Sequence, residues 1–255
     1  MLLVIDIGNT NIKFGLFKKD DLVMLARVSS DRTKTADEFA GEIYSVFNVY
    51  GFTKKDVDGC IISSVVPSVL RTVKEAVGTT MGITPLVVGP GIKTGLNIKI
   101  DNPASTGADL VTGCVAALSL YGAPSVVVSL GTATTIIVLD RSGAMVGGAI
   151  APGVGISMNA LSDKCALLPS SSFEAPKSVI GRSTDECIRS GVVLGSACML
   201  DGMIDRINEE LGEECTVIAT GGIAQDIVPS CRHKIILRDD LMLQGLKIIY
   251  DKNSQ

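Results

Sequence analysis

Short apolar runs alternate with stretches of helical periodicity along the 255 residues, a pattern typical of an α/β fold. The apolar runs predict strands at 2–5, 13–17, 22–29, 58–64, 85–88, 125–129, 136–140 and 215–220. Helical spacing of apolar residues predicts helices at 35–50, 67–77, 109–121, 156–165, 184–211 and 241–250. The segment 89–107 is expected to be a long loop, and 147–153 a glycine-rich link.

The same kind of glycine turn occurs twice, each time after an apolar run and before another. The first reads Asp6-Ile7-Gly8-Asn9-Thr10-Asn11, and the second reads Ser129-Leu130-Gly131-Thr132-Ala133-Thr134-Thr135. Small residues at such a bend let backbone N–H groups approach and surround an anionic phosphate. The repetition predicts two similar half-domains, 1–115 and 116–255, that close on one nucleotide.

Composition narrows the class of protein. The net charge is −4, the pI is about 5.1 and no basic stripe is present, which gives no support for nucleic-acid binding. The first residues lack a basic segment and a cleavage site, and no apolar run reaches the roughly 20 residues that span a bilayer. The seven cysteines include no CxxC pair and are expected to be reduced core thiols of a cytoplasmic protein.

The first turn carries the residue types that hold a metal–phosphate complex. Asp6 could hold Mg²⁺, which takes one or two carboxylates together with phosphate oxygens. Gly8 permits the bend, Asn9, Thr10 and Asn11 offer donors, and Lys13 could add a positive charge. The alternative is an ordinary polar hairpin, but the second copy of the turn favours the functional interpretation.

Asp109 ends the long loop and starts a helix. It could accept the proton of a hydroxyl that attacks a γ-phosphate, since phosphoryl transfer needs alignment, charge neutralisation and one proton acceptor. The alternative is a carboxylate that only complements the helix dipole. In the second turn Thr132 is the expected phosphate contact, whereas Thr134 and Thr135 could simply favour a strand. Gly221 and Gly222 leave room for a flat ligand such as adenine, or mark only a turn.

These segments resemble type III pantothenate kinase, of the actin-like/acetate-kinase-like phosphotransferase superfamily. The resemblance runs essentially end to end through 6–11, 62–67, 93–99, 107–109, 131–135, 147–153 and 219–222. It implies duplicated ribonuclease-H-like domains with mixed sheets flanked by helices. It also implies ATP-dependent phosphorylation of pantothenate to 4′-phosphopantothenate, the first step of coenzyme A biosynthesis, by a homodimer that needs Mg²⁺ and K⁺ or NH₄⁺.

The resemblance assigns roles by motif. Residues 6–13 and Gly131 with Thr132 would contact ATP, and Asp109 would accept the proton. The substrate side would include Gly107, Ala108 and Thr184, the last across the dimer.

Three positions depart from the family pattern. Leu110 replaces an arginine suited to a carboxylate, Ser129 replaces an aspartate at the monovalent-cation position, and Ile100 replaces a tyrosine. They leave open an alternative: a diverged paralogue with another substrate, or a nucleotide-binding regulatory or partner protein.

Overall fold

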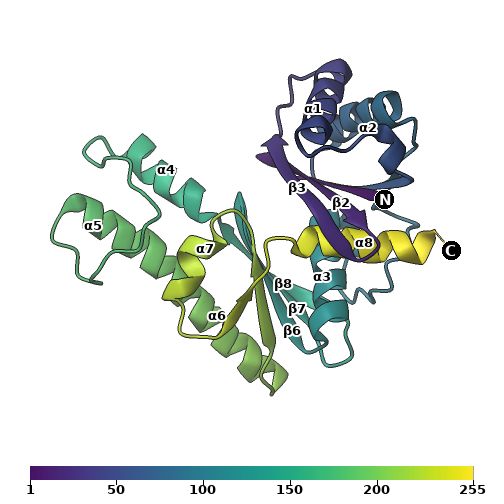
Figure 1. Cartoon of the computed structure of the whole chain (residues 1–255). Coiled ribbons are helices and arrows are strands. Elements are labelled where there is room, and N and C mark those ends of the chain that lie inside the picture. The colour runs from purple at the N-terminus through teal and green to yellow at the C-terminus, as the bar shows by residue number, and fades with distance from the viewer. Residues whose placement is uncertain (255) are drawn as a thin grey trace. The chain divides into compact units, whose positions relative to one another are not determined.

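The computed structural model describes residues 1–254, without the side chain of Ala104. The chain forms two compact units (Figure 1). The first unit contains 1–95, 102–116 and 241–255, and the second contains 96–101 and 117–240. These units differ from the expected halves 1–115 and 116–255 in two places: residues 96–101 belong to the second unit, and the C-terminal helix belongs to the first.

The first unit is a five-stranded mixed sheet with helices. Its strands are β1 (Leu2–Ile7), β2 (Asn11–Lys18), β3 (Asp21–Ser29), β4 (Gly59–Ser64) and β5 (Leu86–Val87), in the order β3-β2-β1-β4-β5. Its helices are α1 (Ala36–Val49), α2 (Pro67–Met81), the first part of α3 (Ala108–Tyr121) and α8 (Leu241–Asn253). The strands β1 to β3 are antiparallel neighbours, whereas β4 lies parallel to β1 and to β5.

The second unit repeats this topology. Its strands are β6 (Ser125–Leu130), β7 (Ala133–Leu139), β8 (Met145–Pro152), β9 (Thr216–Thr220) and β10 (Ile235–Leu237), in the order β10-β9-β6-β7-β8. Its helices are α4 (Val154–Lys164), α5 (Thr184–Arg189), α6 (Gly195–Leu211) and α7 (Ala224–Ile227), and a π-helical segment, Ser190–Leu194, joins α5 to α6. Again three antiparallel strands are followed by two parallel ones. This repeat confirms the predicted duplicated α/β architecture.

Two strands were missed by the sequence pattern. The glycine-rich segment predicted as a link is the edge strand β8, in which Gly147 and Gly148 lie next to a register shift in the pairing with β7. Glycine lowers the strand signal, so only the repeat of a three-stranded meander could have revealed it. The other missed strand, β10, is three residues long and too short to show alternation.

Local sequence signals set the helix ends in the first unit. At the start of α1, the Thr35 hydroxyl accepts from the Glu38 amide, and the Glu38 carboxylate accepts from the Thr35 amide. Pro67 occupies the first turn of α2, and Gly82 ends that helix in the left-handed conformation with φ of 70°.

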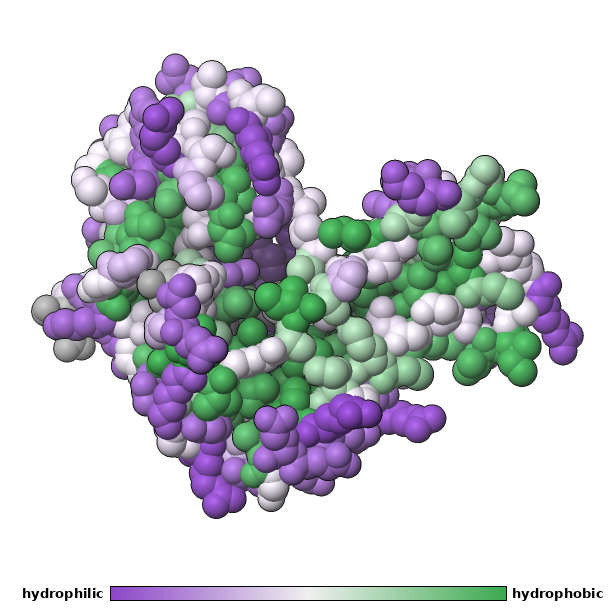
Figure 2. All heavy atoms as spheres, turned by 180° about the vertical axis from the view of Figure 1, so that it is seen from behind, coloured by the Kyte–Doolittle hydropathy of each residue, from purple (hydrophilic) through white to green (hydrophobic). Residues whose placement is uncertain are grey.

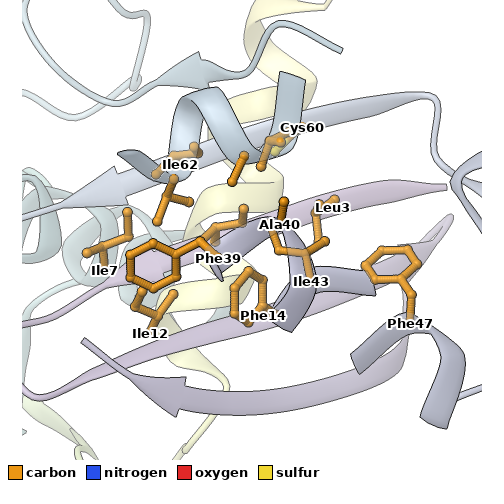
Figure 3. Close-up of a cluster of buried hydrophobic side chains, with 14 of the residues drawn as sticks. Leu3, Ile7, Ile12, Phe14, Phe39, Ala40, Ile43, Phe47, Cys60 and Ile62 are labelled. Atoms are coloured by element: carbon orange, nitrogen blue, oxygen red, sulfur yellow. The ribbon is translucent and has the colours of Figure 1, made fainter. Parts of the chain in front are cut away.

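The sheet of the first unit has two differently covered faces. Leu3, Ile5 and Ile7 of β1 join the core built with α1 and α2, where Phe39 and Ile43 of α1 lie against the sheet (Figure 3). Because successive side chains of a strand alternate, Val4 and Asp6 lie on the opposite face. Helix α8 packs against β1, β4 and β2, and Leu243 of α8 lies close to Gly15 and Val4 on that opposite face.

The second unit has several large apolar residues that are exposed to solvent. Large exposed apolar residues lie in β8 (Ile150), in α4 (Ile156) and in the segment between α4 and α5 (Leu167, Val179 and Ile180). Figure 2 shows apolar surface on this unit. The continuous helical stretch 184–211 is long and apolar enough to cross a membrane by length and composition. In this stretch Ile188, Val193, Leu200 and Ile204 are buried in the core of the second unit. A helix in a protein core can meet the same criteria of length and composition as a membrane-spanning helix.

The cysteines are only partly where we expected them. Cys60 and Cys114 are buried, but Cys165, Cys187 and Cys198 are exposed, so the expectation of core thiols is wrong for these three. All seven are free thiols.

Gly221 makes the close approach of β9 to β6 possible. Its φ is +113°, and a Cβ there would lie 2.3 Å from the carbonyl oxygen of Leu130. We expect Gly221→Ala to lower the free energy of unfolding by at least about 2 kcal/mol, through backbone strain and overlap. Urea unfolding followed by circular dichroism measures this.

The neighbouring Gly222 is the matched control, because a Cβ there would meet no atom within 4 Å. Gly222→Ala should stay within about 0.5 kcal/mol of the wild type. Equal stability of the two variants would contradict the role given to Gly221.

Candidate functional site

A charged row crosses the first sheet where β1 ends. The register pairs Asp6 of β1 with Lys13 of β2 on one side and with Ser63 of β4 on the other. Paired residues project to the same face, so the carboxylate lies between an ammonium group and a hydroxyl. Ser63 is fully buried; its hydroxyl has no partner of ordinary hydrogen-bond geometry, although it lies near enough to lower the pKa of Asp6.

The turn after β1 holds the remaining residues predicted for ATP in this unit. The Gly8 amide donates to the carbonyl of Asn11 at 3.0 Å, and the Ser30 amide donates to the carbonyl of Thr10 at 2.9 Å. Asn9 and Thr10 are exposed, and the Arg32 guanidinium donates to Asn9 Oδ1 at 3.1 Å. The bend is therefore held at its base while its tip remains open to a ligand.

Asp109 lies in the first turn of α3, in the same unit as Asp6. Its Oδ1 accepts from the Leu110 amide at 2.9 Å, so the alternative of a carboxylate at a helix start is part of the observed structure. Gly107 makes room for this arrangement, because a Cβ there would lie 2.5 Å from Asp109 Oδ1.

The two carboxylates interact electrostatically. Burial and then the negative charge of Asp109 raise the pKa of Asp6, Lys13 and Ser63 lower it, and the resulting pKa is about 6. Asp6 nevertheless keeps a partly exposed surface, so it is both crowded and accessible to a small ligand. Burial also raises the pKa of Asp109, against the backbone N–H groups that favour its charged form.

A crowded, partly exposed carboxylate pair of this kind suits a divalent cation. Mg²⁺ needs one or two carboxylates and takes its other ligands from phosphate and water. No cluster of three or more acidic, histidine or cysteine side chains occurs among the described residues, so a closed all-protein metal cage is absent from that part of the chain. Asp6 fits the first type of site.

The equivalent row in the second unit consists of hydroxyls. Ser129 of β6 pairs with Thr135 of β7 and with Thr220 of β9, in the place of Asp6, Lys13 and Ser63. The hydroxyl oxygens of Thr135 and Thr220 are buried and have no hydrogen-bond partner among the described residues. This row offers neutral oxygens and no carboxylate, so it lacks the negative charge that the family resemblance implies at the monovalent-cation site.

The second glycine turn is one residue shorter than the first. Four residues separate Ile7 from its partner Ile12, whereas three separate Leu130 from its partner Thr134. The Gly131 amide donates to the carbonyl of Ala133 at 3.1 Å, and Thr132 is exposed.

Gly153 packs against this second turn, since a Cβ there would lie 2.2 Å from the Thr132 carbonyl oxygen. Gly153 also caps the N-terminus of α4 without a side chain. Backbone N–H groups of a helix start therefore lie next to the turn, as a phosphate site requires.

The remaining predicted residues divide between the units. Gly107, Ala108 and Leu110 lie beside Asp109 in the first unit, and all three are partly buried. Ile100 lies in the second unit, as does Thr184, the exposed first residue of α5. The structure thus brings together the substrate positions around Asp109, and the assignment of both turns to one nucleotide stays a prediction.

Sequence reasoning did not assign Ser63, Thr220 or Arg32 to the site. Ser63 and Thr220 each lie near the end of a parallel strand beside a glycine-turn strand, and that placement depends on the strand register, which sequence alone does not reveal. Arg32 reaches the first turn from the loop after β3, and no spacing signal links it to Asn9.

Asp6 should make stability depend on pH. Its folded pKa is raised, so in metal-free buffer the folded protein holds this proton up to about pH 6, while the unfolded chain releases it near 3.8. Protonated Asp6 therefore stabilises the folded protein at low pH, and this contribution to the free energy of unfolding is lost as pH rises through about 6. Relative to Asp6→Asn, the unfolding free energy of the wild type should fall by roughly 2 kcal/mol between about pH 4 and 7.

Denaturant unfolding at several pH values measures this difference. The exposed Asp163→Asn variant is the control and should follow the wild type. Parallel pH curves for Asp6→Asn and wild type would contradict the raised pKa.

Similar proteins are known. The family model for type III pantothenate kinase matches residues 2–206. A type III pantothenate kinase of Brevibacillus brevis is 45% identical over 99% of both chains, and one of Moorella thermoacetica is 40% identical over 100% of both.

Solved structures agree at the level of the fold. A protein described as a Baf family transcriptional activator, from Campylobacter jejuni, has a TM-score of 0.64 at 20% identity, over 99% of this chain and 98% of that one. An inorganic polyphosphate/ATP-glucomannokinase of Arthrobacter sp. strain KM has a TM-score of 0.52 at 17% identity, over 100% and 99%. From the full-length sequence matches and the family model, the chain belongs to the type III pantothenate kinase family.

Proposed function

We propose that this chain transfers the γ-phosphoryl group of ATP to the hydroxyl of pantothenate, giving 4′-phosphopantothenate for coenzyme A biosynthesis. The proposal rests on the pair Asp6 and Asp109, which lie in the same unit and interact electrostatically. The chain's membership of the type III pantothenate kinase family supports the same reaction.

Each residue has a defined part in the reaction. The N–H groups and polar side chains of 8–11 bind phosphate oxygens, Lys13 offsets their charge, and Gly131 with Thr132 binds phosphate in the second unit. Asp109 takes the proton from the pantothenate hydroxyl as its oxygen bonds to the γ-phosphorus and the bond to the bridging oxygen breaks, releasing ADP. Asp6 would hold Mg²⁺, which would supply positive charge for this transfer.

The residues proposed to bind pantothenate offer fewer charged contacts than the residues proposed to bind the phosphates. Pantothenate carries a carboxylate, and Leu110 next to Asp109 cannot form the charged hydrogen bonds of an arginine. Gly107, Ala108, Ile100 and Thr184 then bind the substrate through backbone, apolar and hydroxyl contacts. We therefore infer a low affinity for pantothenate.

We also propose that the K⁺ or NH₄⁺ requirement implied by the family resemblance does not apply to this chain. The position is occupied by Ser129, within a row that carries no charge. The reaction described above needs no step at that row.

A diverged function is the alternative that the same substitutions favour. Leu110 and Ser129 both remove charge, whereas Asp6, Asp109 and the two turns remain. A protein of this kind could phosphorylate a less acidic alcohol, or bind nucleotide as a regulatory or partner subunit.

We propose a homodimer in the cytoplasm. The exposed apolar residues around α4 and α5, including Ile156 and Leu167, give the second unit a surface suited to a second copy. Thr184, which the resemblance places across the dimer, lies at the start of α5 within the same region.

A coupled assay tests the function directly. With ATP, Mg²⁺ and millimolar pantothenate, we expect ADP and phosphopantothenate from the wild type, and a loss of about 100-fold or more in kcat for Asp109→Asn. No turnover by the wild type, with ATP binding intact in a titration, would favour the diverged function.

Restoring the lost charges should improve the pantothenate reaction. Leu110→Arg with Ser129→Asp replaces interactions worth about 2–5 kcal/mol, so we expect a gain of at least about 30-fold in kcat/KM for pantothenate. The double variant should also respond to K⁺, while the wild type should give equal rates in potassium and choline salts. A K⁺ effect on the wild type would contradict the neutral-row proposal.

A further inference from the structure

Helix α8 covers the face of the first sheet on which Asp6 lies. It contributes Leu241, Leu243, Leu246 and Ile249 to the buried interior and packs against β1, β2 and β4. The helix packs closely against β4, since a Cβ on Gly59 would lie 1.9 Å from the Tyr250 hydroxyl. At Gly59 the contact between β4 and α8 therefore leaves no space for a methyl group.

The same helix lies closely against α3 at Gly245. A Cβ on Gly245 would lie 2.1 Å from the carbonyl oxygen of Thr112, and 2.9 Å from both its carbonyl carbon and its Cγ2. Two of these three atoms are backbone, so no rotamer change could relieve the overlap. Any side chain at residue 245 must push α3 and α8 apart.

Thr112 connects this contact to Asp109. It is fully buried, lies three residues after Asp109 in the first turns of α3, and its hydroxyl donates to the Ala108 carbonyl at 2.7 Å. A displacement of α3 at Thr112 therefore moves the turn that carries the Asp109 carboxylate.

We propose that Gly245 is a positioning residue for Asp109: its missing side chain lets α8 hold the first turn of α3 at a fixed distance from β1 and Asp6. This inference deepens the proposed function, on which its kinetic test depends. The coupling between Asp6 and Asp109 is consistent with the close placement. Helix α8 lies outside 2–206, the segment that the family model matches.

Gly245→Ala tests the proposal against Gly41→Ala. Gly41 lies within α1 of the same unit, and a Cβ there would meet no atom within 4 Å. For Gly245→Ala we expect kcat to fall by at least about tenfold with KM for ATP within about twofold, because proton acceptance is impaired while the ATP turns are unchanged. Gly41→Ala should match the wild type in both constants.

A double variant separates positioning from general damage. In an Asp109→Asn background, Gly245→Ala should lower the melting temperature as before but cause no further fall in kcat. A further fall of about tenfold in that background would overturn the proposal, as would an unchanged kcat in the single variant.

Crystal structures decide the question independently of turnover. We expect the Cα separation between residues 6 and 109 to be larger in Gly245→Ala than in the wild type or Gly41→Ala, and an unchanged separation would overturn the proposal. Lack of kinase activity in the wild type would instead overturn the proposed function. If Gly245→Ala does not fold, Thr112→Ala tests the same contact, because it removes Cγ2 and keeps the carbonyl group that lies against Gly245. We then expect an unchanged separation between residues 6 and 109, and a larger separation would overturn the proposal.

Discussion

Two carboxylates from distant parts of the sequence, Asp6 and Asp109, share the same crowded part of the first unit. Each would have its lowest energy in water, yet burial raises the pKa of both, and the charge of one raises that of the other. Such a pair is stable in its charged form only when positive charge is nearby. Lys13 supplies part of that charge, and a bound Mg²⁺ ion would supply the remainder, so the electrostatics of this unit favour the metal ion on which the proposed reaction depends.

The two units share a topology but not a charge distribution. At equivalent places on the two sheets, Lys13, Asp6 and Ser63 correspond to Thr135, Ser129 and Thr220. The duplicated fold thus provides two similar bends, while only the first follows a strand with a carboxylate in this row. The proposed phosphoryl transfer uses the charged row, whereas Ser129 and Leu110, the positions that the family resemblance gives to the cation and the substrate carboxylate, are uncharged.

Much of this architecture could be predicted from the sequence. The strands on either side of both glycine turns and the helices α1, α2, α3 and α8 follow from apolar periodicity and clear end signals such as Thr35 with Glu38. The strand β8 was missed because Gly147 and Gly148 carry no strand signal. The return of α8 to the first unit was missed because the contacts of Gly245 with Thr112 and of Gly59 with Tyr250 join residues far apart in the sequence, and no local pattern encodes them.

The central claim is that Asp6 holds the metal ion of bound ATP. Calorimetric titration of ATP at about pH 8, with Mg²⁺ or with EDTA, tests it most directly, since Asp6 is then ionised. We expect Mg²⁺ to strengthen ATP binding to the wild type by at least about tenfold, and to Asp6→Asn by less than about threefold. An undiminished Mg²⁺ effect in Asp6→Asn would contradict it.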